Sequence, residues 1–219
     1  MPKSALTRSR RTNVESFVTA LLASDRAKAG DALTAAQSHL RTRVAVISDL
    51  FQPAQERIGE LWYEGKIGVA DEHRATAIVQ ELLLRMPPTP SLHPVSAAAK
   101  CLLAAVGDEQ HVIGLMALRV ALDDEGWRCD FLGARTPTPE LIRVANSSRP
   151  GIAMLTASYL PNVMDIARAI DELHRIPCRV MTGGAAFARV DGLWRRIHAD
   201  AYAPDARIAI RLARQLINE

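Results

Sequence analysis

The feature that most constrains this chain is a proline-rich segment, Met86–Pro94, in which four prolines fall within eight positions. Each proline removes a backbone N–H donor and disfavours the helical conformation of the residue before it, so neither a helix nor a central strand can run through the segment. Such a composition is typical of an extended linker. The 219 residues suffice for two small domains, and we place the boundary between them in a linker over residues 87–97.

Residues 13–86, before the linker, carry helical patterns only. We expect four helices, the first capped by Asn13 and the others covering about residues 27–40, 44–62 and 69–85. Apolar residues of the third helix follow the 3.6-residue period, and Pro53 inside that pattern predicts either a kink or a helix start. Short turns between these helices predict a compact four-helix bundle.

The first twelve residues form a basic tail containing Lys3, Arg8, Arg10 and Arg11. We expect residues 1–12 to be disordered and solvated, and a non-specific contact with DNA or an acidic partner is the alternative. The net charge of the chain is only +3, which is weak support for a nucleic-acid-binding protein.

After the linker, residues 98–219 alternate between short apolar runs and helical patterns. The expected strands are Lys100–Val106, Arg128–Leu132, Ile152–Ala157, Arg179–Thr182 and Ala201–Ala203. The expected helices are Val112–Asp124, Pro139–Ala145, Val163–Leu173, Leu193–His198 and Asp205–Ile217. Five β-α units predict a parallel sheet covered on both faces, with the flavodoxin-like (Rossmann-like) strand order 2-1-3-4-5. The fold class is therefore a helical bundle followed by an α/β domain.

Composition indicates a cytoplasmic protein. The longest apolar runs are too short to span a bilayer, and the basic N-terminus has no apolar segment of the signal-peptide type. Three widely spaced cysteines, Cys101, Cys129 and Cys178, predict reduced, buried and isolated thiols.

Polar residues follow three of the predicted strands. Glu109 and His111 come after the first strand, Ser158 after the third, and Gly183-Gly184 after the fourth. Open α/β sheets bind ligands at the edge where the strands end. Imidazole is a common ligand of transition metals, a nearby carboxylate can fix its tautomer, and paired glycines let a ligand approach the backbone. The pattern predicts a metal-bearing cofactor at this edge.

Three motifs occur in an order that resembles the cobalamin-binding module of methionine synthases, corrinoid proteins and mutases. They are Glu109-x-His111-x-x-Gly114, Ser158-x-Leu160 and Gly183-Gly184. The resemblance implies that His111 is the lower axial ligand of cobalt, and that Ser158, Leu160, Gly183 and Gly184 line the slot for the nucleotide tail. Glu109 replaces the more usual aspartate of the first motif, and the resemblance implies that it orients His111.

A second resemblance lies in the helical half. Trp62, nine intervening residues and Glu72-His73 resemble the Trp-x9-Glu-His signature of cobalamin photoreceptor regulators of the CarH type, within a similar segment that includes Val69. The resemblance implies that the bundle caps the upper face of the corrin. Trp62 would then shield the upper ligand, Glu72 would bind an adenosyl ribose, and His73 and Val69 would line the same pocket. The upper ligand could be adenosyl, methyl or hydroxo.

These resemblances imply a light-responsive, cobalamin-binding transcriptional regulator rather than an enzyme. We expect no helix-turn-helix domain and no direct DNA binding, because about twelve residues precede the bundle. The layout is similar to antirepressors of the AerR type, which act through a transcription factor, so the expected partner is a regulatory protein, with homo-oligomers possible. A corrinoid methyl carrier of a methyltransferase system is the alternative. Tyr63 stands where related regulators can carry a cobalt-binding histidine, and a phenol is a poorer ligand at neutral pH.

Overall fold

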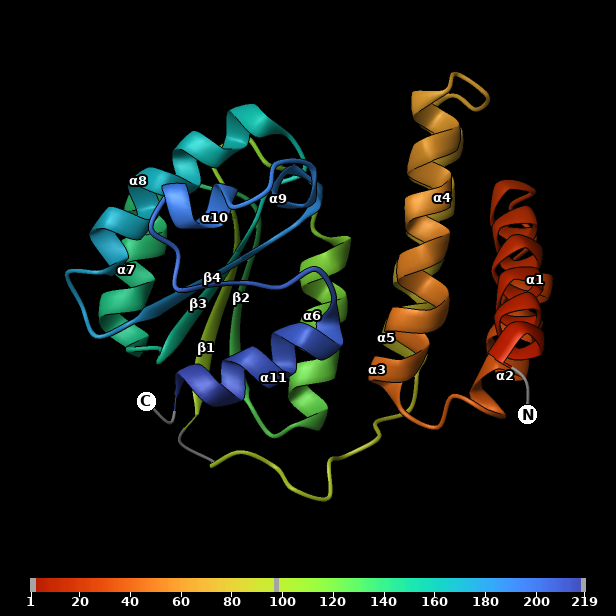
Figure 1. Ribbon diagram of the computed structural model, residues 1–219, viewed down its shortest axis with the longest axis horizontal. Helices are drawn as coiled ribbons and strands as arrows, with labels where there is room; N and C mark the ends of the chain where they lie inside the picture. The colour runs from red at the N-terminus through yellow and green to blue at the C-terminus, as the bar shows by residue number, and fades with distance from the viewer. Residues whose placement is uncertain (1–2, 97–98, 218–219) are drawn as a thin grey trace. The chain divides into compact units, whose positions relative to one another are not determined.

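The computed structural model of the protein (Figure 1) describes residues 3–96 and 99–217. It divides into two compact units between Thr89 and Pro90, within the predicted linker. Parts of that linker are nevertheless fixed. The Thr89 hydroxyl accepts a hydrogen bond from the Arg43 backbone N–H at 3.0 Å, and the backbone N–H groups of Ser91 and Val95 donate to carbonyls at the end of helix α6 (Ile113–Asp124). The backbone N–H groups of Ser91 and Val95 are thus satisfied at the end of a neighbouring helix.

The first unit is helical, as predicted. Its elements are α1 (Lys3–Leu22), α2 (Arg26–Gln37), α3 (Arg43–Val46), the π-helical turn η1 (Ile47–Phe51), α4 (Gln52–Tyr63) and α5 (Val69–Arg85). No helix in residues 3–96 or 99–217 has the length and apolarity needed to cross a membrane.

The predicted third helix consists of α3, η1 and α4 in direct succession. In η1 the Gln52 N–H donates to the Ile47 carbonyl five residues back, one residue more than in an α-helix. Pro53 follows as the second residue of α4, where its missing N–H is least costly. The helix therefore widens by one π turn just before the proline and then restarts.

The start of the first helix differs from the prediction. The backbone of residues 3–12 is helical and continues into α1, so it is not a disordered tail, and Asn13 lies inside the helix instead of capping it. No proline or glycine interrupts residues 3–22, so an uninterrupted helical backbone is allowed there.

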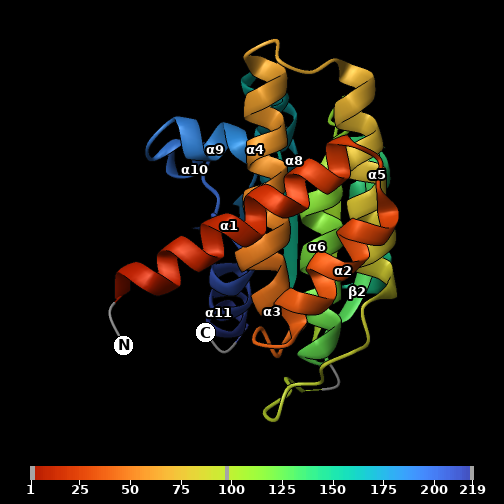
Figure 2. The same ribbon diagram turned by 90° about the vertical axis from the view of Figure 1, so that its right-hand side faces the viewer.

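Helix α1 crosses α4 and α5 in this unit (Figure 2). Phe17 of α1 and Phe51 of η1 stack at a ring-centroid distance of 5.7 Å, and both are buried. Ile58 of α4 and Ile78 of α5 are buried as well. These apolar faces hold the four helical segments together.

The second unit has the predicted α/β fold. Its strands are β1 (Lys100–Val106), β2 (Arg128–Thr136), β3 (Ile152–Thr156), β4 (Arg179–Gly183) and β5 (Ala201–Tyr202). Its helical elements are α6 (Ile113–Asp124), α7 (Thr138–Ser148), the 3-10 turn η2 (Leu160–Asn162), α8 (Val163–Leu173), α9 (Ala185–Arg189), α10 (Leu193–Arg196) and α11 (Ala206–Leu216). All strand pairs are parallel, and their order is β2-β1-β3-β4-β5, which confirms the predicted topology.

Helices cover both faces of this sheet (Figure 1). Alternate residues of β1, including Leu102 and Ala104, join a buried cluster with residues of α7 and α8, while α6 and α11 pack on the other face. The central strands β1 and β3 are buried along almost their whole length. Burial on both faces explains why these strands are continuous apolar runs in the sequence.

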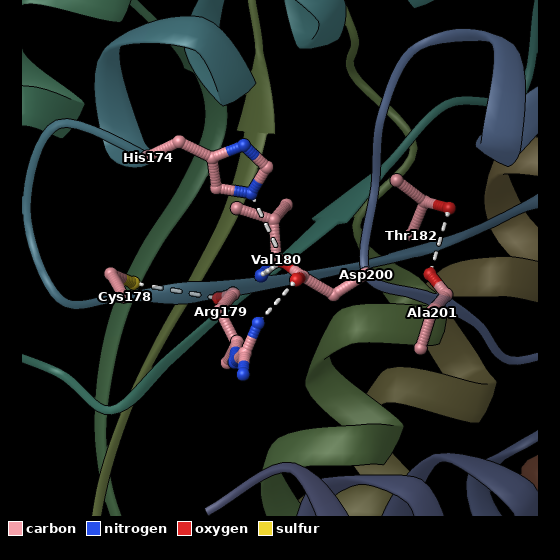
Figure 3. A network of polar contacts seen from close by, with 7 residues as sticks. All are labelled: His174, Cys178, Arg179, Val180, Thr182, Asp200 and Ala201. Carbon is pink, nitrogen blue, oxygen red and sulfur yellow. Dashed lines mark hydrogen bonds and ion pairs between the residues drawn. The ribbon is translucent and has the colours of Figure 1, made fainter. Parts of the chain in front are cut away.

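The amino end of β4 is held by the Asp200 carboxylate (Figure 3). Its Oδ2 accepts a hydrogen bond from the Val180 backbone N–H at 2.7 Å and lies 3.0 Å from His174 Nε2, and its Oδ1 accepts one from Arg179 at 3.1 Å. Burial alone raises the pKa of Asp200, but the hydrogen bonds from Val180, His174 and Arg179 outweigh it, and the pKa lies below its usual 3.8.

Replacing Asp200 by asparagine should lower the free energy of unfolding by about 2 kcal/mol at neutral pH, because an amide NH2 would face one of these donors. A carboxyl group whose pKa is depressed by folding stabilises the protein above its unfolded pKa, and this contribution is lost as the pH falls through the folded value. The deficit of Asp200→Asn relative to the unmutated protein should therefore begin to shrink below about pH 4 and be lost once the pH falls below the folded pKa of Asp200. Urea unfolding at pH 7, 4 and 3 measures it, with exposed Asp191→Asn as the control. A deficit that does not change with pH would contradict this account.

Candidate functional site

The carboxyl ends of β1, β3 and β4 lie side by side in the second unit. The register pairs Ala105 with Thr156, and Thr156 with Gly183, so the loops that follow these strands start from the same edge of the sheet. These loops carry the predicted site residues of this unit. Sheet topology thus gathers the three motifs, as expected for an open α/β fold.

Glu109 lies at the centre of this edge. Its side chain is fully buried, and each carboxylate oxygen accepts two contacts. Oε1 accepts a hydrogen bond from the His111 backbone N–H at 2.9 Å and lies 2.5 Å from His111 Nδ1. Oε2 accepts hydrogen bonds from the Ser158 backbone N–H at 2.6 Å and from the Asn162 side-chain amide at 2.9 Å. One carboxylate therefore ties the loop after β1 to the loop after β3.

Burial alone raises the pKa of Glu109, but the hydrogen bonds from His111, Ser158 and Asn162 outweigh this effect and lower the pKa to about 2. Glu109 is thus a carboxylate at neutral pH. A buried carboxylate is stable only when its oxygens are hydrogen-bonded, and here both oxygens are. The longer glutamate side chain, in place of the aspartate usual in the motif, reaches His111.

His111 is oriented by this carboxylate. Nδ1 faces Glu109, so the tautomer with hydrogen on Nδ1 places the lone pair on Nε2. About half of the His111 side chain is exposed, 48%, whereas that of Glu109 is fully buried. The ring of Tyr159 meets the His111 ring edge to face, with centroids 5.2 Å apart. The imidazole is held by a carboxylate at one nitrogen, the arrangement that raises its basicity toward a metal.

Gly184 brings two loops into close contact. Its φ is +95°, and a Cβ built there would lie 2.4 Å from the Ala157 carbonyl oxygen and 2.7 Å from Thr156 Oγ1. Gly183, the last residue of β4, accepts a hydrogen bond from the Ala157 N–H at 3.2 Å. The paired glycines thus let the loop after β4 run against the end of β3. Gly114, in the first turn of α6, is exposed and has open space around its Cα.

The edge also exposes large apolar side chains. Tyr159, Leu160 and Met164 have 40%, 48% and 60% of their surfaces exposed, and they lie close to Ser158 in the sequence. Single exposed apolar residues are common, but three within six positions, beside a half-exposed imidazole, form a surface suited to a large, partly apolar ligand.

The residues around His111 fit a metal that arrives inside a macrocycle. Within residues 3–96 and 99–217, no group of three or more His, Cys, Asp or Glu side chains is arranged to hold a bare metal ion. A macrocycle such as a corrin would supply most of the ligands of its metal, so a single protein donor such as His111 Nε2 would suffice. The buried Glu109 provides the partner for the other ring nitrogen.

The helical unit carries the other predicted residues around the turn between α4 and α5. Trp62, the next-to-last residue of α4, is 40% exposed, and Val69, the first residue of α5, is 55% exposed. The side chains of Glu72 and His73 are 26% and 73% exposed, and Glu72 Oε2 lies 3.5 Å from His73 Nε2. Trp62 is therefore not a core residue of this unit, and the acids Asp71 and Glu72 occupy the favourable first turn of α5.

Glu72 is held by a hydrogen-bonded chain that joins the two helices. The Thr76 hydroxyl donates to Glu72 Oε1 at 2.9 Å, and the Gln55 amide of α4 donates to Thr76 Oγ1 at 3.0 Å. Gln55 lies two helical turns before Trp62 on the same face of α4, and Val69 and Thr76 are related in the same way on α5. Trp62, Val69 and Glu72 accordingly lie along the adjoining faces of α4 and α5.

Sequence reasoning missed several residues of these networks. Asn162 and Tyr159 contact the predicted pair Glu109 and His111, and Gln55 and Thr76 position Glu72. The signal for Tyr159 and Asn162 was their place in the same loop as Ser158. Gln55 and Thr76 gave no comparable signal, because a hydrogen bond between two helices depends on how the helices pack.

Comparison with known families identifies the family of the chain. Two family models, each described as a B12 binding domain, match residues 14–85 and 99–211. The chain belongs to the B12-binding family. The prediction of cobalamin as cofactor is thereby confirmed, and the two matches correspond to the helical unit and to the α/β unit.

Two relatives in this family are regulators from Myxococcus xanthus. The chain is 30% identical over 121 residues to the HTH-type transcriptional repressor CarA, covering 54% of this chain and 41% of CarA. It is 28% identical over 177 residues to the HTH-type transcriptional repressor CarH, covering 78% of this chain and 57% of CarH. The chain thus spans about half the length of each of these relatives.

Solved structures with the same fold include two cobalamin or corrinoid proteins. A monomethylamine corrinoid protein of Methanosarcina barkeri aligns with a TM-score of 0.74 at 15% identity, covering 94% of this chain and 99% of that protein. A cobalamin-binding protein of Desulfitobacterium hafniense DCB-2 aligns with a TM-score of 0.51 at 18% identity, covering 93% and 98%. At these identities the likeness confirms the B12-binding fold of both units.

Proposed function

We propose that this protein is a cobalamin-binding, light-responsive regulator that senses the upper axial ligand of cobalt and passes the signal to a protein partner, such as a transcription factor. The observation that carries the proposal is the half-exposed Trp62 beside Glu72 at the α4–α5 turn. A large aromatic outside the core, next to a carboxylate held by Thr76, suits a ligand that has both an apolar and a hydroxyl-bearing part. The similarity to two transcriptional repressors supports the regulatory role.

Each group then has a defined task. Bound cobalamin supplies a cobalt ion whose upper axial bond can be broken by light. His111 Nε2 would hold the metal, and Glu109 would keep the proton on Nδ1. Ser158, Leu160, Gly114, Gly183 and Gly184 line the binding edge, at which Gly184 allows close approach of the backbone. Trp62 and Val69 would exclude water from the upper ligand, Glu72 would accept hydrogen bonds from its hydroxyl groups, and His73 would lie beside them.

A change in the upper ligand would alter the contacts of Trp62 and Glu72, and through them the packing of α4 against α5. The hydrogen-bonded chain Gln55–Thr76–Glu72 links α4 to α5 directly, so a shift of Glu72 would change the hydrogen bonds between the two helices. A partner that binds the helical unit in only one of the two arrangements would read the signal. The protein itself carries out no reaction in this proposal.

Two substitutions test the proposal. The protein is reconstituted in the dark with adenosyl-, methyl- and hydroxocobalamin, and its absorption is recorded before and after illumination. His111→Ala should abolish the spectrum of histidine-ligated cobalamin, and cobalamin affinity should fall about 10–100-fold. His93→Ala, which changes an exposed histidine of the same unit, should leave both unchanged. A histidine-ligated spectrum that survives in His111→Ala would overturn the lower-ligand assignment.

Trp62→Ala should change the preference for the upper ligand or the yield of photolysis while leaving the histidine-ligated spectrum intact. Because Trp62 is 40% exposed and the rest of its surface is buried, the same change should lower the free energy of unfolding of the cofactor-free protein by about 2 kcal/mol. Tyr63→Ala, at a neighbouring aromatic that is 84% exposed, is the matched control. If Trp62→Ala has the same upper-ligand preference and the same photolysis yield as Tyr63→Ala, the sensing role of Trp62 is wrong.

The remaining alternative is a corrinoid methyl carrier. Illumination of the reconstituted protein distinguishes the two functions, since a sensor should change its association state or its affinity for a regulatory partner after light. A carrier should instead exchange methyl groups with a methyltransferase and show no such change.

A further inference from the structure

Two of the three cysteines are neighbours in the sheet, contrary to the expectation of isolated thiols. The parallel register pairs Cys101 of β1 directly with Cys129 of β2, strands that lie side by side in Figure 1. The Cys101 thiol donates a hydrogen bond to Cys129 Sγ across 3.0 Å, and both cysteines are free. Residues 28 positions apart in sequence are thus in sulfur–sulfur contact.

The backbone geometry suits a covalent bond between these sulfurs. Neighbouring strands of a sheet lie about 4.8 Å apart, and the Cα atoms of disulfide-bonded cysteines are about 4.4–6.8 Å apart. Because directly opposed residues of parallel strands point to the same face, the two Cβ atoms also project together. Closing a sulfur–sulfur distance of 3.0 Å to about 2.05 Å requires rotation of the side chains only.

We propose that Cys101 and Cys129 form a reversible dithiol–disulfide site that is oxidised by small disulfides such as oxidised glutathione. This inference is independent of cobalamin and of the function proposed above. It rests on the strand register, the contact between the sulfurs and the different exposure of the two thiols.

Exposure sets the order of the steps. Cys129 is half-buried, so it can meet an oxidant, whereas Cys101 is fully buried. The Cys129 thiolate attacks one sulfur of oxidised glutathione, which breaks the glutathione disulfide, forms a mixed disulfide on Cys129 and releases one glutathione thiolate. Cys101 then loses its proton and attacks Cys129 Sγ, releasing the second glutathione. Two protein thiols are oxidised and one glutathione disulfide is reduced to two thiols.

The second step should be the slower one. The hydrogen bond to Cys129 and burial both raise the pKa of Cys101, so its thiolate, the attacking form, is scarce. The oxidant need not reach Cys101, because the resolving attack takes place between sulfurs that are already in contact. The mixed disulfide on Cys129 should therefore accumulate briefly before the internal bond forms.

The bond would fix the edge of the sheet. Among the strands in residues 3–96 and 99–217, β2 pairs with β1 alone, so it is an edge strand held on one side. A cross-link over 28 positions restricts the unfolded chain, and the melting temperature of the oxidised protein should rise by about 5 °C or more.

The test uses the full chain carrying Cys178→Ala, which removes the third thiol and keeps the pair. After incubation with oxidised glutathione, excess reagent is removed, the protein is unfolded, remaining thiols are alkylated, and the intact mass and proteolytic peptides are measured. We expect loss of both thiols, a mass lower by two hydrogens, a peptide in which residues 101 and 129 are linked, and reversal by dithiothreitol. Cys129→Ala in the same background should retain a free Cys101.

Three results would overturn the proposal: two alkylatable thiols, a stable mixed disulfide on Cys129 with Cys101 still alkylatable, or links only between molecules. Circular dichroism checks that each variant is folded. Should Cys129→Ala fail to fold, Cys101→Ala serves instead, since it should stop the reaction at the mixed disulfide.

Discussion

Replacing Gly184 by alanine is expected to lower the free energy of unfolding of the α/β unit by about 3 kcal/mol, one of the two largest effects we foresee. The added Cβ would lie within 3 Å of backbone and side-chain atoms at the end of β3, which are not free to move away. The φ of +95° adds a further cost, because alanine rarely adopts this conformation. Denaturant unfolding of the cofactor-free protein measures the loss.

Gly192→Ala is the matched control for this prediction. Gly192 also has a positive φ, +67°, but in the described part of the chain nothing lies within 4 Å of the position that a Cβ would take there. The Gly192→Ala variant should therefore lose only the free energy that the positive φ costs an alanine, about 1 kcal/mol of unfolding free energy. Equal losses for the two variants would mean that contact between the loop after β4 and the end of β3 is not the reason for glycine at 184.

The second large effect is expected for Glu109→Ala. This change removes the acceptor for the Ser158 N–H, the Asn162 amide and both His111 donors, and leaves buried donors without partners. The free energy of unfolding should fall by about 3 kcal/mol, and cobalamin affinity should fall about 10–100-fold because His111 loses its orientation. Denaturant unfolding without cofactor and titration with hydroxocobalamin measure the two effects separately.

Glu109→Asp provides the comparison, since aspartate is the usual residue of the motif. This substitution keeps the charge but shortens the side chain by one methylene. The free energy of unfolding and the cobalamin affinity should therefore both fall, but by less than in Glu109→Ala. Glu140→Ala, at a surface glutamate paired with Arg143 on α7, should change neither property appreciably. Glu109→Ala that binds cobalamin as tightly as the unmutated protein would show that His111 is oriented by other groups.

The sequence predicted the α/β fold well because its signals are local and repeated. Each central strand is a short apolar run, and each is followed by a helical pattern, so the parallel sheet and its strand order follow from general rules of connectivity. β1 was predicted at its observed bounds, as was α8, which runs from Val163 to Leu173. The strand β2 is longer than predicted, reaching Thr136, because irregular pairing with β1 extends it through polar residues.

Local departures from regular structure were harder to predict. Pro53 indicated an irregularity, but the choice of a π turn over a kink depends on how the helices pack around η1. The N-terminal helical turns looked like a charged tail, since their composition carries no apolar period of its own. Composition also gave no sign that two cysteines would meet, because strand register is set by the whole sheet.

The sequence predicted several residues of the candidate site but not the hydrogen bonds that join its loops. Glu109 and His111 are two residues apart, so their contact follows from the motif itself. The bonds from Ser158 and Asn162 to Glu109 join residues 49 and 53 positions apart. Only the fold brings such residues together. The roles of Trp62 and Glu72 remain predictions for the experiments above.

The Glu109 network has a consequence for how the cofactor arrives. The carboxylate joins the loops after β1 and β3 through hydrogen bonds that lie wholly within the protein, so the entropy lost in ordering these loops is part of the folding free energy. Preorganised loops cost nothing more to order when a ligand docks. Association at this edge should therefore follow simple second-order kinetics, with a rate that rises linearly with cobalamin concentration.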